Sequence, residues 1–126
     1  MFGSLLGCSG VTSKATRHCP DYLAQWQLKP EPLALLNCRL RPQVDDPSKL
    51  TARYMVVGAH AAAVEDFLYH EFGMTRLDHI CCNWHGYPPG SYRDAAGQDY
   101  LVSMYSVETL LQQRAEWSQI PFFGLR

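Results

Sequence analysis

Two adjacent cysteines lie between two histidines in the stretch 79–86, which reads HICCNWHG. Cysteine thiolates and imidazole nitrogens are common ligands of zinc, and a thiol beside a histidine can act as a nucleophile. In an oxidising compartment the same cysteines would instead form disulfides. The stretch therefore raises three kinds of chemistry: metal binding, thiol catalysis and cross-linking.

A metal site is disfavoured by the element expected here. The residues 77–84 are predicted to form one strand, so that Cys81 and Cys82 would point to opposite faces. His79 and Cys81 would share a face about 7 Å apart, while His85 would lie about 13 Å further on. The paired C-x2-C spacing of structural zinc sites is also absent. We therefore expect no metal and no other cofactor.

A small hydrolase, or a thiol- or metal-dependent enzyme, is the alternative interpretation. Such an enzyme would use His79, Cys81 or His70. Asp66 and His70 are four residues apart, which is more typical of an exposed pair on a helix than of an acid–base dyad. The chain contains no C-x-x-C redox pair and none of the common hydrolase or nucleotide-binding motifs. We therefore favour a non-enzymatic protein and assign no catalytic residue.

The N-terminal stretch Leu5-Leu6-Gly7-Cys8 has the form of a bacterial lipobox, whose cysteine receives lipid. The apolar segment before it is shorter than a usual secretion signal, and no Lys or Arg follows Met1. We expect residues 1–18 to be the remnant of a lipoprotein signal and a tether. The protein would then be periplasmic and held to the outer membrane by lipidated Cys8. The alternative is an incidental thiol on a soluble protein.

Lipidation of Cys8 would leave four cysteines for disulfides: Cys19, Cys38, Cys81 and Cys82. A bond between the neighbours Cys81 and Cys82 is disfavoured by ordinary disulfide geometry. Each is therefore expected to pair with Cys19 or Cys38, and both cross-pairings remain open. Either bridge would close a loop of about 40–65 residues and stabilise the domain by roughly 4 kcal/mol.

The surrounding elements are expected in the order α-β-β-α-β-β-β-α, perhaps with a final strand. They are a short helix from Pro20, strands at 33–40 and 51–57, a helix at 61–72, a strand at 77–84, a hairpin of 91–93 and 98–105, a helix at 107–117 and an edge strand at 120–125. In the second helix Val64 and Leu68 would face the sheet, and Glu65 would face water. Strands arriving as hairpins predict an α+β domain over residues 19–126, an antiparallel sheet of about four to six strands with helices on one face.

Composition limits the classes of partner. The 126 residues suit one domain, and the 47 % hydrophobic content suits an ordinary core. The net charge of −1 and the lack of a basic stripe argue against nucleic acid. No apolar run approaches the roughly 20 residues that span a bilayer, so membrane contact is expected only through the lipid anchor.

Eight short motifs follow one another between residues 19 and 123: CPDYL, KPEPL, LNC, AAAVEDFL, CCNW, GSY, SMYSVETL and WSQIP. Their order and spacing resemble a family of small cysteine-containing bacterial lipoproteins, known only as a domain of unknown function. In that family Gly-Trp and an acidic residue usually follow the double cysteine, whereas here Asn83 and His85 occupy those places. The resemblance implies export, lipidation and a framework of four cysteines, and it provides no catalytic residue.

These observations predict a binding module of the cell envelope. It would be an accessory of an envelope complex or an immunity protein that inhibits a toxin delivered to the periplasm. The expected contact surface is the loop from Trp84 to Tyr92, where His85, Tyr87 and Tyr92 lie beside rigid prolines. Tyrosine and tryptophan are enriched at protein interfaces, which makes these four residues the candidates for partner binding.

Overall fold

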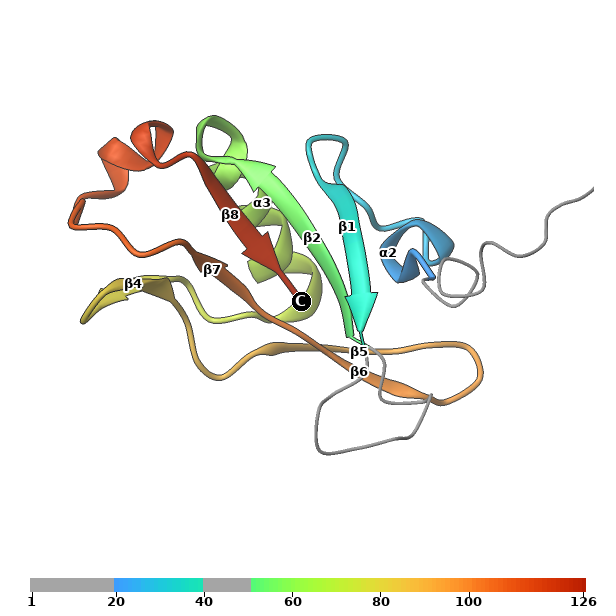
Figure 1. Ribbon diagram of the computed structural model, residues 1–126. Coiled ribbons are helices and arrows are strands. Elements are labelled where there is room, and N and C mark those ends of the chain that lie inside the picture. The colour runs from blue at the N-terminus through green and yellow to red at the C-terminus, as the bar shows by residue number, and fades with distance from the viewer. Residues whose placement is uncertain (1–19, 40–50) are drawn as a thin grey trace, which may run out of the picture.

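The computed structural model describes residues 20–39 and 51–126. Within these residues the main sheet has six strands, every neighbouring pair is antiparallel, and two further strands form a separate hairpin. Figure 1 shows the long helix packed against the main sheet. The predicted α+β fold with an antiparallel sheet is confirmed. Cys8, Cys19 and the tether lie outside the described residues, so their roles stay predictions.

The helices are α2 (Tyr22–Gln25), α3 (Gly58–Phe72) and the 3-10 helix η3 (Arg114–Gln119). The strands are β1 (Ala34–Arg39), β2 (Thr51–Val57), β3 (Asp78–Ile80), β4 (Asn83–His85), β5 (Gly90–Arg93), β6 (Asp99–Val102), β7 (Met104–Ser106) and β8 (Phe122–Leu125). The strand order in the main sheet is β1-β2-β8-β7-β4-β3, and β5 and β6 form the separate hairpin.

Helix α3 buries one side against the sheet. Val64 and Leu68 are almost fully buried, and they are spaced by about one helical turn. The helix ends at Gly73, whose φ of 72° is left-handed and therefore suits glycine. Its first residue, Gly58, lies so close to the carbonyl oxygens of Trp117 and Ile120 that a β-carbon there would collide with both. This close approach joins the start of α3 to the end of η3.

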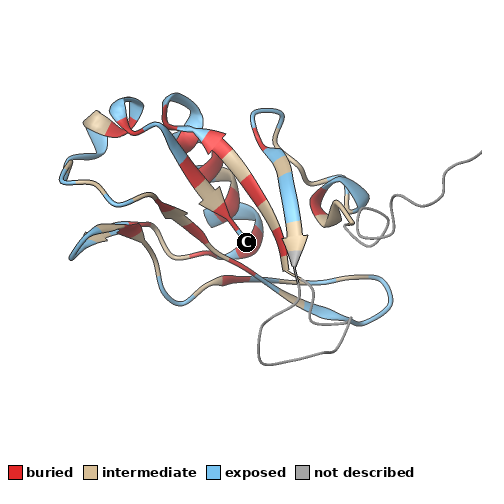
Figure 2. Ribbon diagram, viewed as in Figure 1, coloured by how far each residue is buried: buried red, intermediate tan, exposed pale blue. Residues whose placement is uncertain are grey.

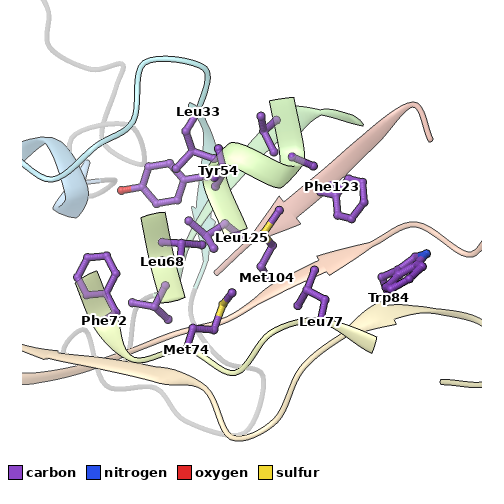
Figure 3. Packing of buried hydrophobic residues seen from close by; sticks show 14 of the residues in the cluster. Leu33, Tyr54, Leu68, Phe72, Met74, Leu77, Trp84, Met104, Phe123 and Leu125 are labelled. Carbon is purple, nitrogen blue, oxygen red and sulfur yellow. The ribbon is translucent and has the colours of Figure 1, made fainter. Parts of the chain in front are cut away.

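The core lies between α3 and the facing side of β2, β8 and β7. Figure 2 shows buried residues on these facing surfaces, with exposed residues on the outer turns of α3. Figure 3 shows how side chains from the helix, the sheet and the segment after the helix meet there: Tyr54, Leu68, Phe72, Met74, Leu77, Met104, Phe123 and Leu125.

The predicted strand at 77–84 is wrong, because the chain reverses within it. β3 and β4 form a tight hairpin in which Ile80 pairs with Asn83, and Cys81 and Cys82 form the turn. Cys81 adopts a φ of 59°, which is left-handed and incompatible with a continuing strand. The expectation that the two cysteines point to opposite faces of a strand therefore fails.

The predicted helix at 107–117 is also wrong except for its last turn, which belongs to η3. The backbone before η3 bonds to the hairpin instead of to itself: Thr109 N donates to Cys82 O, and Leu111 O accepts from the Trp84 indole. The predicted strand at 120–125 does form, as β8, but it is not an edge strand. It lies between β2 and β7.

Candidate functional site

The structure joins Cys81 to Cys82 by a disulfide at the tip of the β3–β4 hairpin. The predicted pairing of these two cysteines with Cys19 or Cys38 is therefore wrong, because the reversal of the chain places both thiols at the same tip. Cys38 is also disulfide-bonded.

The hairpin tip is tied to the loop at 107–113 by a pair of hydrogen bonds. Thr109 N donates to Cys82 O over 2.9 Å, and His79 Nε2 donates to Thr109 O over 2.7 Å. The His79 ring also meets the Trp84 ring edge-on, with centroids 5.7 Å apart. His79 thus holds the hairpin to its neighbouring loop, while the Cys81 sulfur is bonded to Cys82.

His70 is on a different element from His79 and Cys81. It lies on the exposed side of α3, where its Nδ1 is 3.0 Å from Asp66 O and 3.6 Å from Asp66 Oδ1. Asp66 also accepts from Arg76 over 2.9 Å. These side chains form the surface pair that their four-residue spacing indicates, extended by one arginine.

The prediction from the sequence differs most from the structure at Glu65. Its side chain is only 1 % exposed, in a position where we expected water. Arg114 donates to both carboxylate oxygens, over 2.7 and 2.8 Å, and Leu77 N donates over 2.8 Å. Burial alone would raise the pKa of Glu65, but these hydrogen bonds and the positive charges of Arg114 and Arg76 outweigh it and hold the pKa below its ordinary value.

The Glu65–Arg114 pair positions the hairpin end of the molecule. Arg114 also donates to Leu77 O over 2.8 Å and lies over the Trp117 ring, 4.8 Å from its centroid. One buried carboxylate on α3 therefore fixes both η3 and the chain that enters β3. The sequence contains one signal of the burial of Glu65. This residue follows Ala61 by four positions and therefore lies on the buried side of α3.

The four predicted contact residues separate into two groups. Trp84 is buried, its indole donates to Leu111 O over 2.9 Å, and its ring packs edge-on against Trp117. Tyr92 is partly buried and stacks on Trp26, with centroids 4.1 Å apart. Trp84 and Tyr92 thus have structural roles. Tyr87 is 84 % exposed and His85 is partly exposed, so these two reach the surface.

The loop that carries Tyr87 is held close to the end of α3. A β-carbon at Gly86 would lie 2.8 Å from Thr75 O, and one at Gly90 would lie 2.9 Å from Phe72 Cβ. Thr75 N also donates to Pro88 O over 3.4 Å. Main-chain contacts therefore fix the loop on both sides of Tyr87 and leave its side chain projecting into solvent.

A cluster of aromatic rings holds the β5–β6 hairpin against α2 and α3. We call it the aromatic cluster, and it consists of Tyr22, Trp26, Phe72, Tyr92 and Tyr100. Trp26 is central, because its ring contacts each of the other four. Such ring pairs contribute roughly 0.5–1.5 kcal/mol each beyond the apolar area that they bury.

Beside the aromatic cluster lies a pocket of about 510 Å³, between α2, the start of β2 and strand β6. Under it, Tyr54 OH donates to Asp21 Oδ1 over 2.9 Å and accepts from Leu23 N over 3.1 Å. Burial, together with the neighbouring carboxylate, raises the pKa of Tyr54, so its hydroxyl stays protonated. Lys29 pairs with the same carboxylate over 2.6 Å. This network fixes the wall of the pocket that α2 provides.

Within residues 20–39 and 51–126, no three His, Cys, Asp or Glu side chains come together as metal ligands would. No helix within these residues is both long enough and apolar enough to cross a membrane.

No curated protein and no solved structure matches the chain. A family model does match, over residues 8–84, and its description is "domain of unknown function (DUF4952)". The match begins at Cys8 and ends at Trp84, so it includes all five cysteines, α2, α3 and the β3–β4 tip. It covers more than half of the 126 residues, and the chain therefore belongs to this family of unknown function.

Proposed function

We propose that this chain is a non-enzymatic binding module of the cell envelope, exported and held to the outer membrane by lipid on Cys8. Its partner is another envelope protein or a toxin delivered to the periplasm. The observation that carries the proposal is the exposure of Tyr87, which projects from a loop whose main chain is fixed on both sides. The disulfide bonding of Cys38, Cys81 and Cys82 supports an oxidising compartment.

A fixed loop suits an exposed tyrosine for binding. Tyrosine presents a large amphipathic surface, and a loop that is already ordered loses little conformational entropy when a partner binds. Gly86 packs against the main chain of Arg76, whose guanidinium lies over the Tyr69 ring at 4.1 Å. Tyr69 is 43 % exposed. A second aromatic ring and a positive charge thus lie on α3 and on the segment after it, against which the Tyr87 loop packs.

Site-specific photo-crosslinking in intact cells tests this surface. The variant Tyr87→p-benzoylphenylalanine should form a defined cross-linked band with an envelope protein. The matched variant Leu110→p-benzoylphenylalanine carries the probe at another position, 90 % exposed in the native chain, and should not form that band. Identical bands from both positions would contradict a specific surface at Tyr87.

A binding measurement with the identified partner completes the test. Tyr87→Ala should weaken binding by at least roughly tenfold, since hot-spot tyrosines cost more than 1.4 kcal/mol when truncated. The thermal midpoint should not change, because the side chain is exposed. Unchanged affinity would rule out Tyr87 as the anchor.

The anchoring is tested separately. Cys8→Ser should move the protein from the membrane fraction to the soluble fraction, and the intact mass of the native protein should exceed the sequence mass by the attached lipid. An unmodified Cys8 in membrane-fraction protein would contradict lipidation. Titration of the denatured, unreduced protein should find no free thiol among the cysteines after Cys8, and two or more would favour the thiol-enzyme alternative.

A further inference from the structure

The turn that joins β3 to β4 consists of Cys81 and Cys82, which are bonded to each other. Both residues are exposed, so a thiol of another molecule can reach their sulfurs. Exposed disulfides are reduced more readily than buried ones, and a bond between neighbours gains little stability from loop closure. The hairpin tip therefore carries a disulfide that can be opened with little loss of overall stability.

The disulfide constrains the backbone of the turn. Joining neighbouring residues through their sulfurs closes a small ring that includes the peptide bond between them, and this ring limits the conformations of both residues. Within the ring Cys81 has a φ of 59°, in the left-handed region that residues other than glycine rarely adopt. Opening the bond removes the ring and lets Cys81 return to commoner backbone angles. The carbonyl groups of the turn would then change direction.

One of these carbonyl groups holds the neighbouring loop. Cys82 O accepts from Thr109 N over 2.9 Å, and Thr109 O accepts from the His79 ring over 2.7 Å. The loop 107–113 is thus bonded to the hairpin through both main-chain groups of Thr109. A change in the direction of Cys82 O would remove one of these two bonds.

Anchors on both sides limit how far the change can spread. On the hairpin, Trp84 N donates to Ser106 Oγ over 2.9 Å, and the Trp84 indole donates to Leu111 O over 2.9 Å. After the loop, Arg114 is bonded to both carboxylate oxygens of buried Glu65. The part that can respond is therefore short and lies around Thr109.

We propose that the Cys81–Cys82 disulfide is a redox switch, which releases the loop around Thr109 when an external dithiol reduces it. One thiolate of the dithiol attacks a sulfur of the pair, so that the sulfur–sulfur bond breaks and a mixed disulfide forms. The second thiol of the dithiol then attacks the mixed disulfide and closes the disulfide of the oxidised reagent. Both cysteines become thiols with the protons that the dithiol gives up.

The switch would change an exposed surface. Leu110, next to Thr109, is 90 % exposed, and Ile80, next to the turn, is 55 % exposed. Release of the loop would alter the relative positions of these two apolar side chains, which the oxidised tip holds in one arrangement. The proposal goes beyond the binding module and depends neither on Cys8 nor on Tyr87.

Graded reduction tests whether this disulfide opens first. The native chain is titrated with dithiothreitol, free thiols are blocked with N-ethylmaleimide, and peptide mass spectrometry identifies the labelled cysteines. Before any reductant Cys81 and Cys82 should be unlabelled, and they should become labelled at a dithiothreitol concentration that leaves Cys38 unlabelled. Labelling of Cys38 first, or at the same concentration, would overturn the switch.

Amide hydrogen exchange followed by NMR tests the coupling to the loop. At that dithiothreitol concentration the amide of Thr109 should exchange roughly tenfold faster, because it loses its acceptor. The amide of Leu77, which donates to buried Glu65, should keep its rate. An unchanged rate at Thr109 would overturn the proposal, and so would equal acceleration at Leu77, which would show general loosening.

The double variant Cys81→Ser/Cys82→Ser is the matched control. It lacks the bond at the tip and keeps the disulfide of Cys38. Its Thr109 amide should exchange at the faster rate without any reductant and should not respond to dithiothreitol. A response equal to that of the native chain would assign the effect to the disulfide of Cys38 and overturn the proposal.

Discussion

Two ends of the molecule are held in place by different forces, and they lie on opposite sides of Figure 1. The hairpin end consists of β3, β4, the loop 107–113 and η3, and hydrogen bonds converge there on buried Glu65. The aromatic end consists of α2 and the β5–β6 hairpin, and ring contacts around Trp26 hold it.

The two ends should therefore respond differently to substitutions. Several donors around a buried carboxylate fix the orientation of the groups as well as the distances between them. Their hydrogen bonds weaken together when the carboxylate loses its charge. Ring packing is less directional and depends mainly on buried apolar area. At the hairpin end the polar groups thus converge on one buried charge, whereas the aromatic end has a pocket beside its rings.

The largest loss of stability is expected when the buried charge at the hairpin end is removed. Glu65→Ala should lower the free energy of unfolding by about 3 kcal/mol, because Arg114 and Leu77 N lose their acceptor. Urea unfolding followed by tryptophan fluorescence measures it. Asp66→Ala is the control on the same helix, and its exposed pair with Arg76 should cost less than about 1 kcal/mol. Equal losses would contradict the central role of Glu65.

At the aromatic end, Trp26→Ala should cost about 2–3 kcal/mol. This is below the usual range for a fully buried tryptophan because the Trp26 side chain is only partly buried. Hydrogen exchange should show the loosening in β5 and β6 and not in β3 and β4. Tyr69→Ala, at an exposed ring, should change stability by less than about 0.5 kcal/mol. Loosening that spreads equally to both hairpins would show that the two ends are not separate.

Acid should weaken the hairpin end. The pKa of Glu65 is held below its ordinary value of 4.5 in the folded protein, so its contribution to stability is present above pH 4.5 and is lost as the pH falls through the folded pKa. The slope of unfolding free energy against pH in this acidic range should flatten in Glu65→Gln. Asp21→Asn, which removes a partly exposed carboxylate at the aromatic end whose pKa is also lowered, should flatten it less. A larger flattening of the slope in Asp21→Asn than in Glu65→Gln would contradict the prediction that acid acts mainly on the hairpin end.

The smallest effect is expected at the cysteine pair. A disulfide between neighbours closes a minimal loop, so the double variant Cys81→Ser/Cys82→Ser should lose only about 1 kcal/mol. The double variant is a better test than a reductant, which would also act on the disulfide of Cys38. A loss near the 4 kcal/mol expected for a long-range bridge would contradict the local bond.

Local patterns predicted the parts of the fold that depend on local interactions. The strand at 51–57 and the end of α3 at Phe72 were expected where they are found, because alternation and helical spacing are properties of short segments. The errors at 77–84 and 107–117 have different causes. The first segment reverses within itself and pairs as the β3–β4 hairpin. The second bonds to that hairpin, for example from Thr109 N to Cys82 O, and no short window of sequence reveals such a pairing.

The candidate sites were predictable to different degrees. Tyr87 was predicted as a contact residue from its type and from the neighbouring prolines, which are local signals, and the structure shows that its side chain is exposed. Trp84 was predicted as a contact residue from its place in the same loop, whereas the structure buries it. The pocket beside the aromatic cluster could not be foreseen, because its walls come from α2, β2 and β6, which are far apart in the sequence.

The packing of Gly86 and Gly90 has a consequence for how this family could diversify. The shape of the intervening loop is set by main-chain contacts at its two ends, and the side chain of Tyr87 contributes little to it. Residue 87 can therefore be exchanged without remodelling the scaffold. In the binding module that we propose, a library varied at position 87 should change the recognition properties while leaving the folding intact, which makes this loop the natural place to engineer a new specificity.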